Sequence, residues 1–595
     1  MPNTRAAQLV VIVVLASLLA GERRMAAQFF VPVEGECPAR LLGPVQLDVP
    51  SIVIQPQILL NGAPFPGNEG GAAILTLWAS EPSPLFDGPQ LVLAETHLAR
   101  NPVRVIPGVY DVYYSWLSGA DIPRNQATRV LQGVTLDHSG DLVIDLRMIR
   151  VEGLKHHNGI PFGYDGFAAL SLRSLDRPGS VALGSAQPAE FETAIMPGRY
   201  AFEYDWQQGA SVPHNRHTAV RELDLLSSVR DLVLNVPSVM QPLQFLHNGA
   251  AFQSSQFNRG DLVLRRGATG EVAAGSSHEG DTAIPVIPGS YDVHWRHVVG
   301  ANVPGNTDVQ VARGLRMDGA LRVIDVPSIE VSGTFLVNGQ PTPITELNNA
   351  RLHLVGKDRG DTLRLGETRY GAFVTRVVPG TYDIVYEHVN GASPLPVNPR
   401  ATLARGWRVE HMPQRTIDIP AGTYKGDYVW NGGNFLPSEF NNGQIYAVPA
   451  TADADPVLLG QTRYGGFDRV LLPGSYRAAY GHQVGHDVPQ NAFTTFGPAR
   501  RVISEAETVE SIEVQSGPLE VTFLHNSTLL PAGGSQNIRV HLSRGLNYLL
   551  LPESIDGPRT IDAIGGRFDL FYQYRGGQDL PRNAFMRFGC WTLTR

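Results

Sequence analysis

A unit of about ninety residues, repeated six times, constrains the fold of this chain more than any other feature of its sequence. Its clearest marker is Pro-Gly-x-Tyr, found at residues 107–110, 197–200, 288–291, 379–382 and 473–476, with a diverged copy at 565–568. The second residues of these markers lie 90, 91, 91, 94 and 92 positions apart. A constant period of this length indicates that each repeat is one structural unit packed against its neighbours.

Two further markers keep a fixed place in every unit. A loop motif, Gly-x-x-x-Pro-x-Asn, begins 11 residues after the marker glycine at 119–125, 209–215, 300–306, 485–491 and 577–583, and with one residue inserted at 391–398. An Asn-Gly pair opens the units at Asn61, Asn158, Asn248, Asn338 and Asn431, with Asn526-Ser527 as the sixth version. A linking segment at 324–328 recurs at 47–51 and, in shorter form, at 417–420.

Each unit has the pattern of β-structure. Between the first two markers of unit one, Tyr110, Val112, Tyr114 and Trp116 alternate with polar residues, which places one face of a strand in a core and the other in water. No segment shows an amphipathic helix of ten or more residues. About seven short strands in ninety residues predict an all-β chain of six tandem two-sheet β-sandwiches.

The N-terminus predicts export. Residues 9–20 form a 12-residue apolar run after a single charge at Arg5, which is the length of a signal-peptide core and too short for a membrane span. Arg23 and Arg24 leave an uncleaved signal anchor open. We expect a signal peptide at 1–27, a short segment at 28–44, and repeats at 45–140, 141–232, 233–322, 323–413, 414–509 and 510–595.

Composition narrows the classes of function. The 43% of apolar residues excludes wholesale disorder, and a net charge of −8 over 595 residues gives no reason to expect a nucleic-acid partner. Without its signal the chain has no further stretch that could span a membrane, so it should lie outside the cytoplasm, as an extracellular, periplasmic or cell-envelope protein. Cys37 and Cys590 occupy nearly equivalent positions at the two ends of the array. An open array would let them bond only between molecules, whereas a closed array would let them meet within one chain.

Several segments together resemble a known family. Residues 333–339, 352–354, 370–373 and 378–382 resemble the carboxypeptidase regulatory-like domain, and residues 464–467 and 473–476 of unit five match as well. The resemblance implies that the six tandem domains are transthyretin-like (prealbumin-like) Greek-key β-sandwiches, and that each is a non-catalytic module of a kind often found in secreted and envelope proteins. The Gly-x-x-x-Pro-x-Asn loop is not part of that family's pattern, and starch-binding-like or fibronectin-like sandwiches stay open.

The repeated loops supply the candidate ligand-facing residues. Six copies of one loop on rigid sandwiches could bind with avidity, and an aromatic or histidine side chain three residues before each loop could stack on a sugar ring. The alternatives are turn chemistry, since Gly and Asn tolerate positive φ, and a last inward residue of the strand. The candidates are Trp116, Asn125, Trp206, Asn215, His297, Asn306, His388, Asn398, His482, Asn491, Tyr574 and Asn583.

No motif of an enzyme is present. The sequence has no nucleophile elbow, P-loop, dinucleotide fingerprint or HExxH, and no unit repeats a set of metal ligands, so we expect no catalytic residue, cofactor or metal. The leading hypothesis is a non-catalytic secreted or envelope protein that acts as a structural spacer or multivalent adhesion module, with a cell-surface protein or polysaccharide as its partner. A carbohydrate-binding array and an accessory subunit of an extracellular enzyme are the alternatives. The oligomeric state stays open.

Overall fold

The computed structural model describes residues 37–594, apart from short stretches at 67–70, 82–87, 89–90, 98–100, 164–165, 253–254, 357–360, 411–413, 437, 531 and 534. The signal peptide expected at 1–27 therefore lies outside the described residues, as does most of the segment at 28–44. The residues from Pro38 onward form one compact unit. Across the described residues, no helix has the length and apolar character needed to cross a membrane.

The prediction of an all-β chain is confirmed. In the described part of the chain the regular elements are strands, joined by three single-turn 3-10 helices: η1 (Thr368–Tyr370), η2 (Thr462–Tyr464) and η3 (Ser554–Asp556). The strands form two sheets per repeat, and the two sheets enclose an apolar core. We call these sandwiches modules 1 to 6 in chain order.

The first sheet of each module is built around one long strand. In module order this central strand is β3 (Ile52–Leu60), β11 (Ile149–His157), β19 (Val239–His247), β27 (Ile329–Val337), β35 (Gly422–Trp430) and β44 (Ser516–His525). Its antiparallel neighbours are β7 (Val103–Val105), β15 (Glu190–Ile195), β23 (Thr282–Val286), β31 (Ala372–Val377), β39 (Gly466–Leu471) and β48 (Arg559–Ile564). A short hairpin strand follows at β4 (Ala63–Pro64), β12 (Ile160–Pro161), β20 (Ala250–Ala251), β28 (Gln340–Pro341), β36 (Gly433–Asn434) and β45 (Thr528–Leu529).

The second sheet has four strands in a constant order, edge–inner–inner–edge, and in module 6 a fifth strand, β1 (Ala39–Leu41), is added beyond the second edge. The first edge is β6 (Leu91–Glu95), β14 (Ser180–Ser185), β22 (Gly270–Ser276), β30 (Thr362–Glu367), β38 (Val457–Gln461) and β47 (Asn547–Leu550). The inner strand beside it is β5 (Ala72–Ala79), β13 (Phe167–Ser174), β21 (Arg259–Arg266), β29 (Asn349–Gly356), β37 (Asn442–Pro449) and β46 (Asn537–Arg544). The second edge is β9 (Thr128–Leu136), β17 (Thr218–Leu225), β25 (Val309–Met317), β33 (Ala401–Val409), β41 (Thr494–Val502) and β50 (Met586–Thr594).

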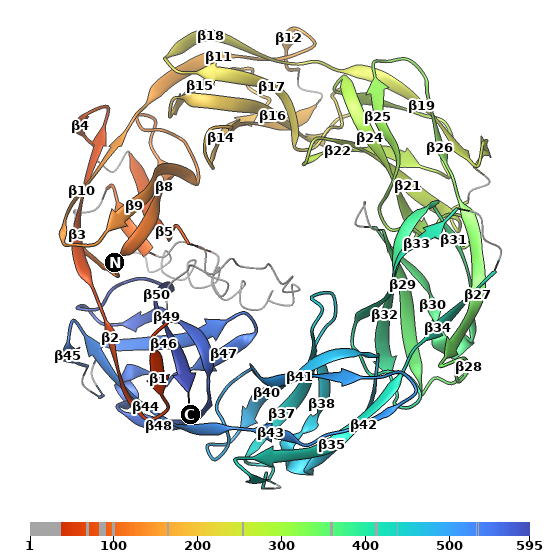
Figure 1. Cartoon of the computed structure of the whole chain (residues 1–595). Helices are drawn as coiled ribbons and strands as arrows, with labels where there is room; N and C mark the ends of the chain where they lie inside the picture. The colour runs from red at the N-terminus through yellow and green to blue at the C-terminus, as the bar shows by residue number, and fades with distance from the viewer. Residues whose placement is uncertain are drawn as a thin grey trace, which may run out of the picture. The chain divides into compact units, whose positions relative to one another are not determined.

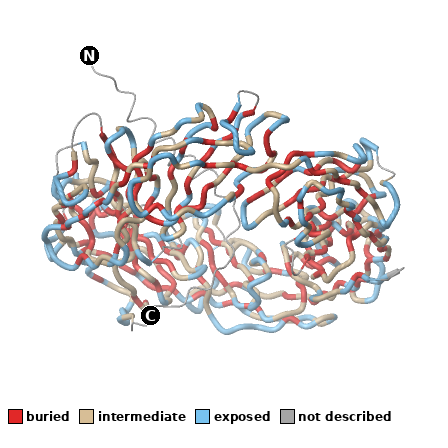
Figure 2. The backbone as a smooth tube through the Cα atoms, turned by 90° about the horizontal axis from the view of Figure 1, so that it is seen from above, coloured by how far each residue is buried: buried red, intermediate tan, exposed pale blue. Residues whose placement is uncertain are grey.

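The second inner strand carries the predicted aromatic stripe. It spans 11 residues in every module: β8 (Gly108–Ser118), β16 (Gly198–Gln208), β24 (Gly289–Val299), β32 (Gly380–Asn390), β40 (Gly474–Val484) and β49 (Gly566–Gly576). In β8 the side chains of Tyr110, Val112 and Tyr114 are fully buried, while Trp116 is half-buried. Buried stretches lie along the strands of the modules (Figure 2). Period-two alternation therefore predicted the inward face of this strand correctly.

A connecting strand completes the first sheet of each module. It runs parallel to the central strand of the module before it, at β10 (Gly140–Leu146), β18 (Val229–Val236), β26 (Arg322–Val326), β34 (Gln414–Ile419), and the pair β42 (Glu507–Val509) and β43 (Ile512–Val514). The limits expected at 140, 232, 322, 413 and 509 cut or precede these strands. We propose module limits drawn after them, since hydrogen bonding assigns each strand to the preceding module.

Module 6 receives its connecting strand from the other end of the chain. β2 (Pro44–Val49) pairs in parallel with β44, from Pro44 opposite Glu520 to Val49 opposite His525. Figure 1 shows this red segment beside the blue strands of module 6. The core residues of modules 1 and 6 form a single hydrophobic cluster. The array is therefore closed, with each module contacting two neighbours.

A second strand and a disulfide lie at the same closure. β1 (Ala39–Leu41) pairs in parallel with β50, and Ala39 lies opposite Thr592. Ala39 comes two residues after Cys37, and Thr592 two residues after Cys590. Both cysteines are disulfide-bonded. Because the chain contains only these two, they bond to each other, which is the outcome that the sequence predicted for a closed array.

The Asn-Gly turns fix the connecting strands in place. In module 3, the Oδ1 atom of Asn248 accepts from the backbone N–H of Ser328 at 2.8 Å, and the N–H of Gly249 donates to Asp325 at 3.0 Å. Asn248 adopts a φ of 52° and Gly249 a φ of 76°, which explains why this pair of residue types opens the units. Module 6 uses the same turn on β2, where Asn526 accepts from the N–H of Ser51 at 2.8 Å and Ser527 bonds to Asp48.

We predict that β2 is required for the stability of module 6. The Val49 side chain is fully buried, so Val49→Asp would place an unpaired carboxylate in the core and lower the free energy of unfolding by at least about 3 kcal/mol. Gln46→Asp makes a carboxylate at an exposed position of the same strand and should have little effect. Urea unfolding measures both. Equal midpoints for the two variants would contradict the proposed role of β2.

Candidate functional site

The six loop asparagines lie at the joints between modules. Each is fully buried, with no exposed side-chain surface: Asn125, Asn215, Asn306, Asn398, Asn491 and Asn583. Their amides are therefore engaged within the protein and are not presented to a ligand. Sequence reasoning left open whether this asparagine serves a ligand or the backbone, and the structure assigns it contacts with the next module.

The amide oxygen of each asparagine binds the backbone of the following module. It accepts from the N–H of an apolar residue just before the Pro-Gly-x-Tyr marker, at 2.7–2.9 Å in all six joints. In module order, the residues that donate to the preceding module are Ile106, Met196, Ile287, Val378, Leu472 and Ile564. Five of their side chains also extend a neighbouring module's core: Met196 lies in the cluster of modules 1 and 6, and Ile287, Val378, Leu472 and Ile564 lie in those of modules 2, 3, 4 and 5. Each joint therefore combines a buried hydrogen bond with buried apolar surface.

The amide nitrogen binds the tyrosine of the same marker. It donates to the hydroxyl of Tyr200, Tyr291, Tyr382, Tyr476 or Tyr110 at 2.8–3.2 Å. Each hydroxyl in turn donates to the carbonyl four residues earlier, at 2.6–2.7 Å. Burial raises the pKa of Tyr110, Tyr200, Tyr291 and Tyr476, so their hydroxyls stay protonated and able to donate.

The joint between modules 5 and 6 departs from this arrangement. Phe568 stands where the other modules have tyrosine, and it has no hydroxyl to accept from Asn491. The Asn491 amide nitrogen instead donates to Thr494 Oγ1 at 2.8 Å and to the carbonyl of Ile564 at 3.3 Å. The joint between modules 5 and 6 therefore forms even though its marker has diverged and lacks the tyrosine.

A backbone hydrogen bond runs beside each asparagine. The residue before it donates its N–H to the following module, as from Arg124 to Ala194 at 2.8 Å and from Gly305 to Arg376 at 2.9 Å. At the closing joint, Arg582 donates to Arg104 at 3.0 Å. The closing joint thus has the same backbone contact as the other five.

The six aromatic or histidine candidates brace their own loops. The indole nitrogens of Trp116 and Trp206 donate to the carbonyls of Gly119 and Gly209 at 2.9 and 3.0 Å, and Tyr574 donates to Gly577 at 2.9 Å. His297 and His482 bond through Nδ1 to loop proline carbonyls at 3.1 Å, and His388 bonds to the backbone of Gly391. All six side chains are half-buried. Only part of each ring faces solvent, and one polar atom of each side chain is bonded to the backbone of its loop.

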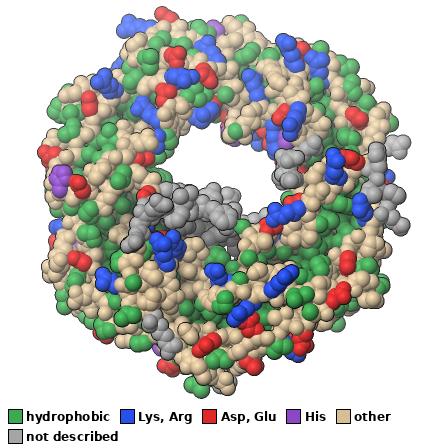
Figure 3. Space-filling model, in the orientation of Figure 1, with side chains coloured by type: hydrophobic (Ala, Val, Ile, Leu, Met, Phe, Trp, Pro, Cys, Tyr) green, Lys and Arg blue, Asp and Glu red, His purple; other side chains and the backbone are tan. Residues whose placement is uncertain are grey.

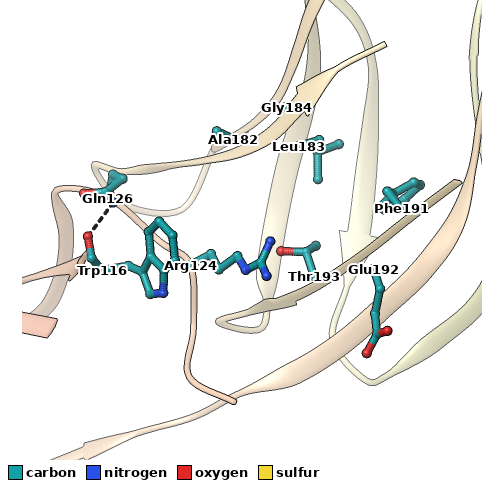
Figure 4. Close-up of a pocket in the computed structure, with 9 residues that line it drawn as sticks. All are labelled: Trp116, Arg124, Gln126, Ala182, Leu183, Gly184, Phe191, Glu192 and Thr193. Carbon is teal, nitrogen blue, oxygen red and sulfur yellow. Dashed lines mark hydrogen bonds between the residues drawn. The ribbon is translucent and has the colours of Figure 1, made fainter. Parts of the chain in front are cut away.

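One of these residues also lines a pocket of about 240 Å³. Trp116 and Arg124 of module 1 face Thr193, Phe191 and Leu183 of module 2 across it. Figure 4 shows the Arg124 guanidinium directed toward Thr193, and the hydrogen bond from Gln126 to the backbone of Trp116. At this joint, a residue that the sequence selected as a candidate lines a cavity.

Within the described residues, charged side chains do not gather into a metal site. Across the part of the chain that the structure describes, no group of three His, Cys, Asp or Glu side chains is placed to hold a metal ion. Acidic and basic side chains are interspersed on the face shown in Figure 3.

Comparisons with known proteins identify similar solved structures but no family for this chain. No known protein family and no curated protein matches the sequence. Solved structures with some similarity include the Bacillus anthracis TIE protein (10% identity, 68% of this chain and 71% of that one, TM-score 0.13). A second is a streptococcal ancillary pilin (12% identity, 46% of this chain and 98% of that one, TM-score 0.14). A third is two B repeat units of the Staphylococcus aureus collagen binding protein (10% identity, 58% of this chain and 94% of that one, TM-score 0.13).

At these TM-scores the similarity gives no argument for what the chain does. The β-sandwich repeat architecture is established by the fold itself. The narrower resemblance to the carboxypeptidase regulatory-like domain is not confirmed by any family match and stays a prediction.

The sequence did not predict the part that the marker tyrosine plays in the joint. The marker tyrosine was assigned to the core of its own module, and its hydrogen bond to the preceding module was not predicted. A signal existed, because Asn125 and Tyr200 recur with nearly constant separation, as Asn215 and Tyr291 do. That separation identifies a pair only once two modules are known to be in contact.

We predict that the joint asparagines stabilise the array. Asn398→Leu would leave the buried N–H of Leu472 without its acceptor, which should lower the free energy of unfolding by about 1–3 kcal/mol. Asn434→Leu is the same substitution at an exposed position and should change it little. Urea unfolding checks the pair, and an Asn398→Leu midpoint equal to that of Asn434→Leu would count against the joint.

Stability should also fall in mild acid. Burial lowers the pKa of nine histidines below 6.5: His214, His247, His294, His297, His353, His388, His482, His525 and His541. As the pH falls below about 6.5, the unfolded chain binds protons before the folded chain does, so folding becomes less favourable.

The measurement is the urea midpoint at pH 7.5 and at pH 5.5. We expect a lower midpoint at pH 5.5, and a smaller drop for His388→Phe, which removes one titrating group. A midpoint that holds or rises on acidification would contradict the prediction.

Proposed function

We propose that this protein is a non-catalytic structural scaffold of the extracellular space or cell envelope, whose six sandwiches hold one another in a closed array. The observation that carries this proposal is the buried asparagine joint, which recurs six times and includes the joint between the last and first modules. Such joints fix the distance and orientation between modules, which is what a spacer or a platform requires.

The disulfide supports a location outside the cytoplasm. The bond between Cys37 and Cys590 requires an oxidising compartment to form and persist. The apolar run at residues 9–20 agrees with export. Removing the covalent link would leave closure to β1, β2 and the joint of Asn583.

Adhesive contact is the second part of the proposal. Phe257, Leu347 and Phe440 each lie two residues before the inner strand of the second sheet in modules 3, 4 and 5, and they are 69%, 78% and 81% exposed. Large apolar side chains exposed at equivalent positions of neighbouring modules suit multivalent contact with a cell-surface protein or polysaccharide. They are additional to the residues that the sequence analysis selected.

The carbohydrate-binding array remains the second candidate. It is favoured by the partly exposed rings of Trp116, Trp206 and Tyr574. The bonds of their polar atoms to their own loops, and the histidines in the other three modules, make a uniform sugar platform less well supported. An accessory role to an extracellular enzyme has no observation in its favour.

The test uses the whole oxidised chain on immobilised polysaccharides and cell-surface proteins, together with a broad panel of hydrolase substrates. We expect retention without turnover, and a loss of retention in the triple variant Phe257→Ser, Leu347→Ser, Phe440→Ser. The control is Val92→Ser, Leu226→Ser, Leu529→Ser, which removes exposed apolar side chains from modules 1, 2 and 6. Turnover of a substrate, or equal retention by the two variants, would overturn the proposal.

A further inference from the structure

The pocket between modules 1 and 2 contains polar atoms that the protein leaves without partners. Arg124 Nε and Thr193 Oγ1 are both buried, and neither has a hydrogen-bond partner. Thr193 is only 4% exposed and lines the pocket. A buried hydroxyl or guanidinium nitrogen without a partner is unfavourable, so this pair indicates a place where a bound molecule would complete the hydrogen bonding.

The other joints show that the array does not need this pair. The position of Arg124 is occupied by His214, Gly305, Val397, Gln490 and Arg582 in modules 2 to 6, and that of Thr193 by Ile284, Thr375, Arg469, Ile561 and Val103 in the modules that follow them. Arg582 repeats the arginine, but it faces a module with Val103 in place of the hydroxyl. The combination of arginine and threonine is therefore particular to this joint and is not a requirement of joining modules.

The electrostatics favour an anion. Glu192 lines the same pocket, but its carboxylate accepts from Arg150 Nη1 at 2.9 Å, and Arg150 also binds Asp121 at 2.6 Å. The Arg124 guanidinium lies 5.7 Å from the centre of the Trp116 ring, and it makes no ion pair with any residue that the structure describes. A carboxylate suits such a site, since guanidinium binds it through two parallel hydrogen bonds.

The remaining walls define the rest of the ligand. Trp116, Phe191 and Leu183 provide apolar and aromatic surface, and the volume of about 240 Å³ lies below the roughly 300–1,000 Å³ of pockets that hold drug-sized molecules. We propose that this pocket binds a small carboxylate that carries a single ring, with the carboxylate on Arg124 and Thr193 and the ring against Trp116. This site is additional to the scaffold role and does not depend on it.

Binding is measured by calorimetry on the full oxidised chain with two probes, D-glucuronate and benzoate, which distinguish a sugar ring from an aromatic ring. Their uncharged counterparts are methyl glucoside and benzyl alcohol. We expect at least one acid to bind and its uncharged counterpart to bind about tenfold more weakly or not at all. Failure of both acids to bind, or equal binding of acid and counterpart, would overturn the proposal.

Variants locate the bound acid. Arg124→Gln and Thr193→Val should each weaken binding about tenfold, because each removes a hydrogen bond to the carboxylate. Arg582→Gln makes the same change at the equivalent position of module 6 and should leave binding unchanged. Binding that is insensitive to Arg124→Gln, or equally sensitive to Arg582→Gln, would show that the acid binds elsewhere and would refute the site, while thermal melts confirm that the variants are folded.

Discussion

The structure depends on a buried asparagine amide at the boundary between consecutive modules. An amide can donate and accept at once, and here it does both toward the next module, with Asn398 accepting from Leu472 and donating to Tyr476. Because both groups are buried, any shift of one module against the other would leave them unpaired. The apolar residue that donates the N–H adds burial energy, and the amide determines the orientation in which that burial occurs.

The array is closed because the asparagine joint also forms between module 6 and module 1. An open array of six modules would have five such joints, and this one has six. Asn583 bonds to Ile106 and Tyr110 as its counterparts bond to their own neighbours, and β2 supplies the strand that module 6 lacks. In every module a connecting strand also pairs with one edge of the central strand, which protects that edge from pairing with another chain. In an open repeat array, stability propagates from neighbour to neighbour and the end modules are held on one side only. In this protein each of the six modules is held on two sides.

Local periodicity predicted the sandwiches, while the joints required knowledge of which modules touch. The alternation of Tyr110, Val112 and Tyr114 determines an inward face within one strand, so it could be recognised from sequence. Asn125 could not be interpreted in the same way, because asparagine after glycine and proline is equally suited to a turn, and its partner Tyr200 lies in another module. The origin of the sixth connecting strand was indicated by the recurrence of segment 324–328 at 47–51, but only a closed array gives that recurrence its meaning. The candidate pocket depends on Thr193, which has no motif around it and is distinguished only by the absence of a partner in the fold.

The six repeats also distinguish residues that the architecture requires, which occur in every module, from residues that occur in one module alone. Features present in every copy, such as the buried asparagine and the apolar residue that binds it, are explained by the joint they build. Phe568 shows that even the tyrosine can be replaced when Thr494 takes over the hydrogen bond. A buried polar pair found at one joint, and unpartnered there, has no such explanation, because five joints of the same geometry form without it. In a repeat protein, a specific ligand should therefore be sought where one joint has polar side chains that the other joints lack. The pair of Arg124 and Thr193 is such a case, and its guanidinium and hydroxyl suit a carboxylate.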